Sequence, residues 1–201
     1  MKMFGPSRRD VWEALAREIG ATFTQGTFWN GRDKVVAEVG PWQVTLDSYV
    51  VSHGQTSTRY TRMRAPYVNA DGFRFSIRRR NVFDGIAEAL GYFDVQVGFP
   101  EFDQAFVIKG TDEQKLCKLF SNPRLRVLLS IQQKVHLQVR DDEGWFRQTF
   151  PQGVDELAFT VVGTIKDIDR LKRLFDLFAE TFHTLCHIGS AYEDDPGIVL
   201  G

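Results

Sequence analysis

The chain has 201 residues, of which 43% are hydrophobic and 25% charged, and its formal net charge is −1. These values are ordinary for a globular protein, and the balanced charge implies no partner by itself. The two cysteines, Cys117 and Cys186, match no disulfide framework, and no apolar stretch reaches the ~18 residues of a membrane helix. We therefore expect a cytoplasmic protein with its own hydrophobic core and no membrane span.

The first part of the chain, residues 1–91, is predicted to be an α+β half. Ser7 and Asp10 form a Ser-x-x-Asp capping box before an apolar stripe at helical spacing, and Gly20 can end that helix in the left-handed conformation. Residues 22–80 alternate apolar and polar side chains between turn residues, which predicts antiparallel strands. This half ends with a predicted hairpin, whose strands are residues 58–68 and 73–80, and with a short helix over residues 81–91.

The second half, residues 92–201, also combines strands with helices. An apolar strand over 104–109 precedes two short helices separated by Pro123. Three strands follow, around residues 135–139, 145–150 and 157–161. Thr164 and Asp167 then cap the longest helix, predicted over residues 166–187. Its apolar side chains repeat at spacings of three and four, which predicts a stripe that packs on a sheet or a second helix. This stripe consists of Ile168, Leu171, Phe175, Phe178, Phe182 and Leu185.

The predicted fold class is α+β, with antiparallel sheets packed by helices in two consecutive halves. The strands and helices do not alternate regularly, which argues against a parallel doubly wound sheet. A long helix after consecutive antiparallel strands is typical of a helix-grip or saddle-like arrangement. The two halves form either two small domains or one compact domain. The 17 phenylalanines predict a Phe-rich core or, alternatively, an apolar ligand cavity.

Local motifs for catalysis are missing from the sequence. It contains no phosphate-binding or dinucleotide-binding glycine loop, no nucleophile elbow, no Cys-x-x-Cys and no His-Glu-x-x-His. We therefore predict no cofactor and lean against an enzyme. His183 and His187 lie four residues apart on the predicted last helix and are weak metal-ligand candidates, with solvated surface histidines as the favoured alternative. The acids over 141–143 are better explained as turn residues than as a cation site.

Arginines concentrate between Thr58 and Val82. The segment has seven arginines and one acid, Asp71, which leaves a net charge of +6. Arginine presents a planar fork that binds phosphate or carboxylate, so an anion-binding sheet face is one interpretation. Its partner would be a phospholipid headgroup, a nucleic acid or an acidic protein. The alternatives are edge-strand protection and internal pairing with the acidic remainder, which is the usual fate of such charge. The candidate residues are Arg62, Arg64, Arg74, Arg78 and Arg80.

A stretch within residues 98–146 carries a resemblance. It contains Glu101-Phe102-Asp103-x-x-Phe106-Val107-Ile108, then Asp112, Leu119-Phe120-x-x-Pro123, Leu128-Leu129 and Val139-x-Asp141. This order resembles a bacterial family of uncharacterised proteins, many of which have membrane-spanning helices that this chain lacks. The resemblance implies no activity or ligand. It implies a bacterial protein that acts near a membrane surface, so the expected location is cytoplasmic and peripheral to the membrane.

The leading functional hypothesis is a non-catalytic binding or scaffold module for an anionic partner. It depends on the arginine-rich strands and on the missing catalytic motifs. One alternative is a small apolar-ligand carrier, or an enzyme, with a Phe-lined cavity. Another is a homo-oligomeric assembly protein that dimerises through the long last helix.

Overall fold

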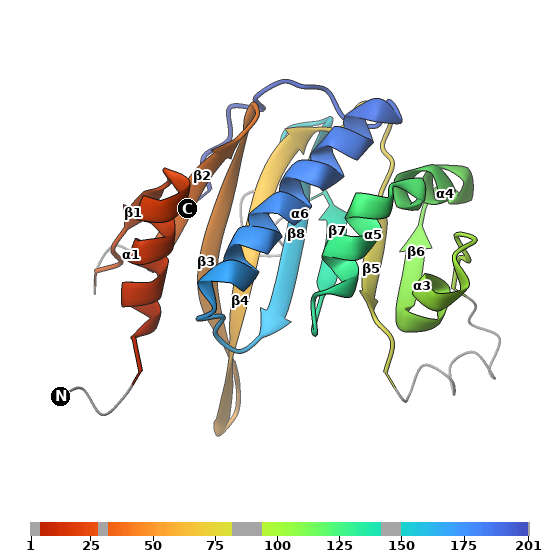
Figure 1. Ribbon diagram of the computed structural model, residues 1–201. Helices are drawn as coiled ribbons and strands as arrows, with labels where there is room; N and C mark the ends of the chain where they lie inside the picture. Colours follow the sequence, from red (N-terminus) through yellow and green to blue (C-terminus); the bar gives the residue numbers. More distant parts are fainter. Residues whose placement is uncertain (1–4, 28–31, 82–93, 142–149, 201) are drawn as a thin grey trace.

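The computed structural model describes residues 5–27, 32–81, 94–141 and 150–200 (Figure 1). Over these ranges, eight antiparallel strands form one open sheet and five helices accompany it, which confirms the predicted α+β class. The helices are α1 (Arg8–Ile19), α3 (Pro100–Ala105), α4 (Glu113–Ser121), α5 (Pro123–Ser130) and α6 (Ile168–His187). The strands are β1 (Thr22–Thr24), β2 (Lys34–Val39), β3 (Trp42–His53), β4 (Thr56–Val68), β5 (Phe75–Arg79), β6 (Phe106–Gly110), β7 (His136–Arg140) and β8 (Val154–Val162).

The sheet order is β1-β2-β3-β4-β8-β7-β5-β6, so β8 and β7 of the second predicted half lie between β4 and β5 of the first half in one sheet. The predicted hairpin of residues 58–68 and 73–80 is therefore wrong. β4 pairs with β8, with Met63 opposite Phe159, while β5 pairs with β6 and β7. An alternating apolar and polar pattern determines which face of a strand is buried, but it does not determine which other strand pairs with it.

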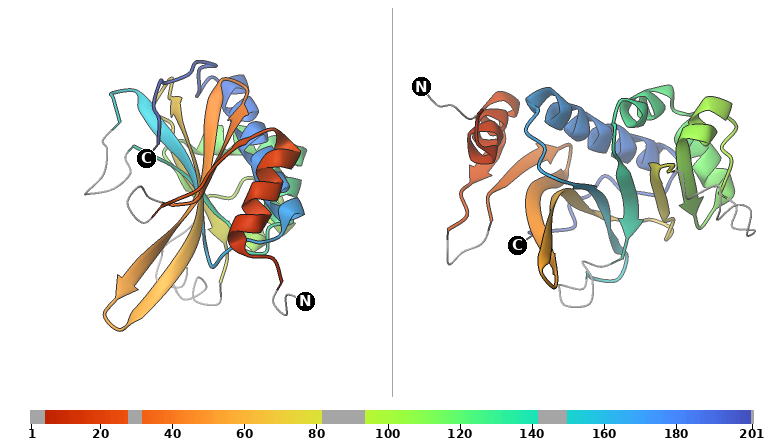
Figure 2. Two further views of the ribbon diagram at one scale, coloured as in Figure 1. Left: turned by 90° about the vertical axis from the view of Figure 1, so that its left-hand side faces the viewer. Right: turned by 90° about the horizontal axis from the view of Figure 1, so that it is seen from below.

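The helices cover one face of the sheet, and the core lies between these two layers (Figure 2). The apolar stripe of α6 packs into this core, as predicted for a helix lying on a sheet. The Phe182 ring stacks on Trp42 at 4.5 Å between centroids and meets Tyr67 edge-on at 5.5 Å. Phe175, Phe178 and Phe182 are buried, which accounts for the stripe without a second copy of the chain.

The predicted capping signals at both ends of α1 are confirmed by the structure. The Ser7 hydroxyl accepts from the Asp10 N–H at 3.2 Å, and the Asp10 carboxylate accepts from the Ser7 N–H at 3.0 Å. Gly20 ends α1 with φ of 69°, in the left-handed region. Asp167 is itself the N-cap of α6, which begins at Ile168, so the predicted role of Thr164 in the cap is wrong. The predicted strand over 104–109 starts later, at Phe106, because Pro100 begins the short helix α3. The predicted helix over 81–91 and strand over 145–150 lie largely outside the described residues.

The β3–β4 hairpin extends beyond its neighbours in the sheet (Figures 1 and 2). The two strands stay paired out to His53 opposite Thr56, whereas the β2 pairing reaches only Leu46 and the β8 pairing reaches only Tyr60. We call the projecting residues 50–58 the arm. None of the helices among the described residues is long and apolar enough to cross a membrane.

Candidate functional site

Two of the predicted site residues lie in a buried ionic network on the sheet face opposite the helices. Arg62 donates to the Asp47 carboxylate from Nε at 2.8 Å and from Nη2 at 2.5 Å, and Arg64 Nη2 donates to the same carboxylate at 3.0 Å. The Arg64 side chain is fully buried and also lies 3.8 Å from Glu156, which in turn pairs with Arg140. These guanidinium groups are held by carboxylates of the same chain, and little of their surface reaches solvent.

The other three predicted residues lie apart from this network. β5 spans only residues 75–79, so Arg74 and Arg80 lie beyond its two ends. Arg74 pairs with Asp155 at 3.1 Å and with Asp141 at 3.0 Å. Arg80 pairs with Asp94 at 2.9 Å. Arg78 donates to the Arg79 carbonyl at 3.3 Å.

The five residues therefore do not form one open face. Four of them are paired with acids from other parts of the chain, which is the internal pairing that the sequence left open. Asp141, from the acidic turn, takes part in this pairing, while residues 142 and 143 lie outside the described ranges. Anion binding by these five residues stays a prediction, and a separate cluster of arginines lies at another place on the described surface.

A cluster of four arginines, Arg8, Arg9, Arg32 and Arg59, surrounds a depression of about 280 Å³ at the root of the arm. Arg8 and Arg9 are the first two residues of α1, Arg32 precedes β2, and Arg59 belongs to β4. We call this set the arginine cluster. Its four members come from three segments that are far apart in the sequence, and the sheet order brings these segments together.

Two buried polar groups anchor the arginine cluster. Asp33 accepts from Arg8 at 2.8 Å and from Arg9 at 3.2 Å, and its carboxylate is 3% exposed. Ser48 Oγ accepts from Arg8 Nη1 at 2.7 Å and lies 3.5 Å from Arg59 Nη1. Burial acts to raise the pKa of Asp33, but hydrogen bonds from Arg8, the Gly26 N–H and Arg9 outweigh it and hold that pKa below its usual value. Asp33 therefore stays ionised beside the arginines.

The charge of the depression is not balanced. Of the described residues that line it, Asp33 is the one acid, so four guanidinium groups and one carboxylate leave three positive charges in excess. Arg8 and Arg9 also occupy the first turn of a helix, where the positive end of the dipole disfavours cations by about 0.3–1 kcal/mol each. The buried Nε of Arg8 has no acceptor among the described residues. An anion in the depression would offset the excess charge and the unfavourable position of the two arginines at the helix start.

The arginine cluster was missed at the sequence level, although one signal was present. Ser7-Arg8-Arg9 places two cations where a helix normally prefers acids, and this conflict with the dipole marks the pair as unusual. Arg59 was counted in the arginine-rich segment but was not singled out. Its proximity to Arg8 arises because both reach Ser48, which lies 40 residues from Arg8 along the chain.

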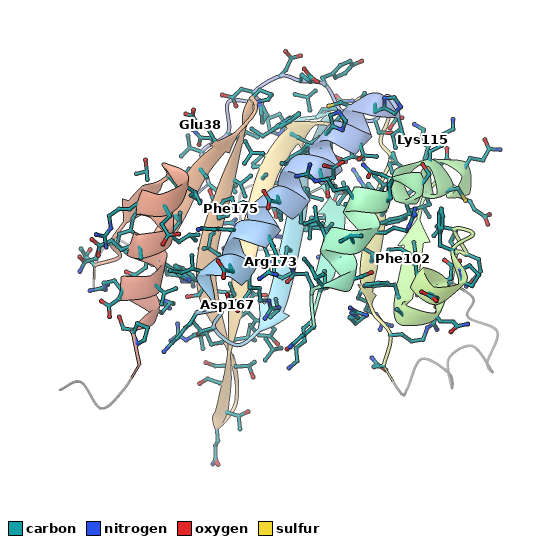
Figure 3. All side chains as sticks on the ribbon, viewed as in Figure 1. Glu38, Phe102, Lys115, Asp167, Arg173 and Phe175 are labelled. Carbon is teal, nitrogen blue, oxygen red and sulfur yellow. The ribbon has the colours of Figure 1, made fainter. Side chains whose placement is uncertain are left out.

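A second concave site corresponds to the Phe-lined cavity that the sequence offered as an alternative. An open groove of about 810 Å³ runs between α3 and α5, lined by Phe99, Phe102, Val127 and Ile131 together with Arg79 and Arg126. Phe102 lies on the side of α3 that faces α5 (Figure 3). The Arg126 guanidinium lies 3.5 Å from the centre of the Phe99 ring. Val127 and Ile131 are 59% and 46% exposed, so apolar surface faces solvent here.

The metal candidates are placed on the surface of α6. His183 and His187 are both exposed near the end of that helix. In the described ranges, no group of three or more His, Cys, Asp or Glu side chains is arranged to hold a metal ion. The pair thus has no further protein ligand beside it in those ranges.

Comparisons with protein-family models, with curated proteins and with solved structures found no match. The functional conclusion therefore depends on the geometry of the two concave sites.

Proposed function

We propose that the protein is a non-catalytic binding module that holds an anionic partner at the arginine cluster. The observation that supports this is the excess of three positive charges around the depression at the root of the arm. Guanidinium groups bind phosphate and carboxylate through paired, charge-assisted hydrogen bonds, and several of them together form a strong anion site. The proposal keeps the anionic partner expected from the sequence but moves the contact from the five predicted arginines to Arg8, Arg9, Arg32 and Arg59.

The chemistry of the depression favours binding over catalysis. Its carboxylate, Asp33, already accepts hydrogen bonds from two arginines and a backbone N–H, so it is a poor general base. Its buried hydroxyl, Ser48, accepts from arginines, and no histidine is among the described residues that line the site. A nucleophile needs an adjacent base, and this arrangement supplies none in the described ranges.

Calorimetric titration with tripolyphosphate tests the proposal. The triple variant R9Q/R32Q/R59Q removes the three exposed arginines and leaves Arg8 to neutralise Asp33. We expect it to bind at least tenfold more weakly than the wild type, since charge-assisted hydrogen bonds contribute about 1.5–3 kcal/mol each. Arg17→Gln is the matched control, because Arg17 is exposed at the opposite end of α1. Equal binding by the triple variant and the control would refute the proposal.

A second candidate function is that of a carrier for a small apolar ligand with an acid group. The exposed apolar lining of the α3–α5 groove supports it, and Arg79 and Arg126 supply positive charge beside that lining. Arg79 donates to the carbonyl oxygens of Gln132 and Ser130, and Arg126 donates to the carbonyl oxygen of Phe120. Displacement of a fluorescent fatty acid by dodecanoate tests this function. Val127→Glu should abolish the binding, and an unchanged affinity in that variant would exclude the groove.

A further inference from the structure

The arm projects far enough from the sheet to enter a groove in a partner molecule. It is a two-stranded ribbon in which Val50 pairs with Arg59 and Ser52 pairs with Ser57. At about 3.3 Å per residue, the stretch from Val50 to the tip at Gly54 projects roughly 13 Å. Figure 2 shows that it extends away from the body of the sheet. The arm is therefore long enough to enter a depression about as deep as a DNA groove.

The tip of the arm is polar and carries no acid. Residues 48–58 contain no Asp, Glu, Lys or Arg in a chain that is 25% charged. Ser52, Gln55 and Ser57 are exposed near the tip, while the two valines lie nearer the root. A hairpin that inserts into a membrane needs apolar side chains at its tip, so this arrangement does not suit a lipid surface. Hydroxyl and amide side chains without acids suit a surface that presents both donors and acceptors next to negative charge.

Positive charge surrounds the root of the arm. The arginine cluster lies there, and Lys166 adds a further cation beside the start of α1, where its Nζ donates to the Pro6 carbonyl at 3.3 Å. The start of α6, marked by Asp167, the neighbour of Lys166 in the sequence, lies at the same end of the molecule as the arm (Figure 3). A partner that accepts the arm would therefore meet cations where the arm joins the body.

We infer that the anionic partner is B-form duplex DNA, with the arm in its major groove and the arginine cluster on the flanking phosphates. This inference rests on the proposed function of the cluster. The major groove is about 12 Å wide and 8.5 Å deep and admits a two-stranded β-ribbon. Phosphates line both edges of that groove, so cations at the root of an inserted ribbon reach them. The major groove of A-form RNA is too narrow for side chains to read, which favours DNA.

Fluorescence polarisation with a labelled 20-base-pair duplex tests the inference. Phosphate contacts by the three exposed arginines, Arg9, Arg32 and Arg59, predict a slope of log K against log salt of about −2.7, and the variant R9Q/R32Q/R59Q should bring this slope close to zero. The arm variant Q55E/S57E adds two negative charges at the tip and should weaken DNA binding at least tenfold. Its matched control is Q104E/Q114E, which adds the same charge at exposed positions on α3 and α4. Thermal unfolding verifies that all variants are folded.

The outcomes separate this inference from the proposed function. Loss of DNA binding in Q55E/S57E, with tripolyphosphate binding retained, supports the arm as the groove-binding element. Equal affinity for an RNA duplex of the same sequence, or for phosphatidylglycerol vesicles, overturns the inference while tripolyphosphate binding upholds the arginine cluster. DNA binding that is equal in Q55E/S57E and Q104E/Q114E overturns the role of the arm. If the wild type binds neither DNA nor tripolyphosphate, both proposals are wrong.

Discussion

Asp47 is the central acceptor of the buried ionic network, and its replacement by Asn should strongly destabilise the protein. Its carboxylate accepts three hydrogen bonds, two from Arg62 and one from Arg64, whose side chain is fully buried. Removing one partner of a buried ion pair leaves an uncompensated charge and costs about 3–5 kcal/mol. For a chain of this size, 1 kcal/mol shifts Tm by about 2–4 °C. We therefore expect Asp47→Asn to lower Tm by about 6–20 °C.

Urea unfolding and calorimetry measure this loss against a matched control. Glu38→Gln removes a carboxylate from the same sheet face, on β2, but Glu38 is exposed and should cost no more than about 0.5 kcal/mol. A loss below about 1 kcal/mol in Asp47→Asn, or equal losses in the two variants, would refute the view that this network is held by Asp47.

The Asp47 carboxylate should also contribute to the pH dependence of the protein's stability. Burial acts to raise the pKa of Asp47, but the hydrogen bonds and charges of Arg62 and Arg64 outweigh it and hold the pKa below its usual value. A folded-state pKa below the unfolded one contributes stability above about pH 3.9, and this contribution is lost as the pH falls through the folded-state pKa. Asp47→Asn should therefore flatten the acid limb of the stability curve. An acid limb as steep as that of the wild type would contradict this assignment.

Three further predictions concern other parts of the molecule. Asp33→Asn should lower the free energy of unfolding by about 1–3 kcal/mol and tighten tripolyphosphate binding, because the arginine cluster loses its carboxylate; weaker binding measured by calorimetry would contradict this. Gly110→Ala should cost about 1–3 kcal/mol in urea unfolding, because the new Cβ would lie 2.9 Å from the Arg74 carbonyl oxygen; an unchanged midpoint would exclude that close approach. Burial and the charges of Arg78 and Arg140 lower the pKa of His136, so the wild type should lose stability as the pH falls below about 6.5, and His136→Gln should remove part of that loss; identical stability curves from pH 7.5 to 5 would show that His136 does not contribute.

Helices α1, α4, α5 and α6 could be predicted from the sequence because their signals are local, whereas the short helix α3 was missed. The Ser7–Asp10 box, the left-handed Gly20 and the Asp167 cap each act through hydrogen bonds or backbone angles within a few residues. The stripe of α6 was also readable, because residues three and four apart share one face of a helix. The α+β class followed from these helices together with the alternating strands.

Local signals could not identify strand partners. The sequence pattern of β4 is compatible with pairing to either β5 or β8. Its pairing with β8 depends on how the whole sheet packs beneath α6. For the same reason, the arginine-rich segment was visible as a net charge of +6, but its neutralisation by Asp47, Asp155 and Asp94 was not.

The sequence by itself therefore determined four of the five described helices, most of their caps and the excess of arginine over residues 58–82. Only the tertiary structure decided which arginines are paired and which remain exposed. The physical reason is that a hydrogen bond or an ion pair requires proximity in space, and the sheet brings Arg8, Asp33 and Arg59 together from segments that are distant in the chain. The arm and its basic root are likewise consequences of where the strands β2 and β8 end.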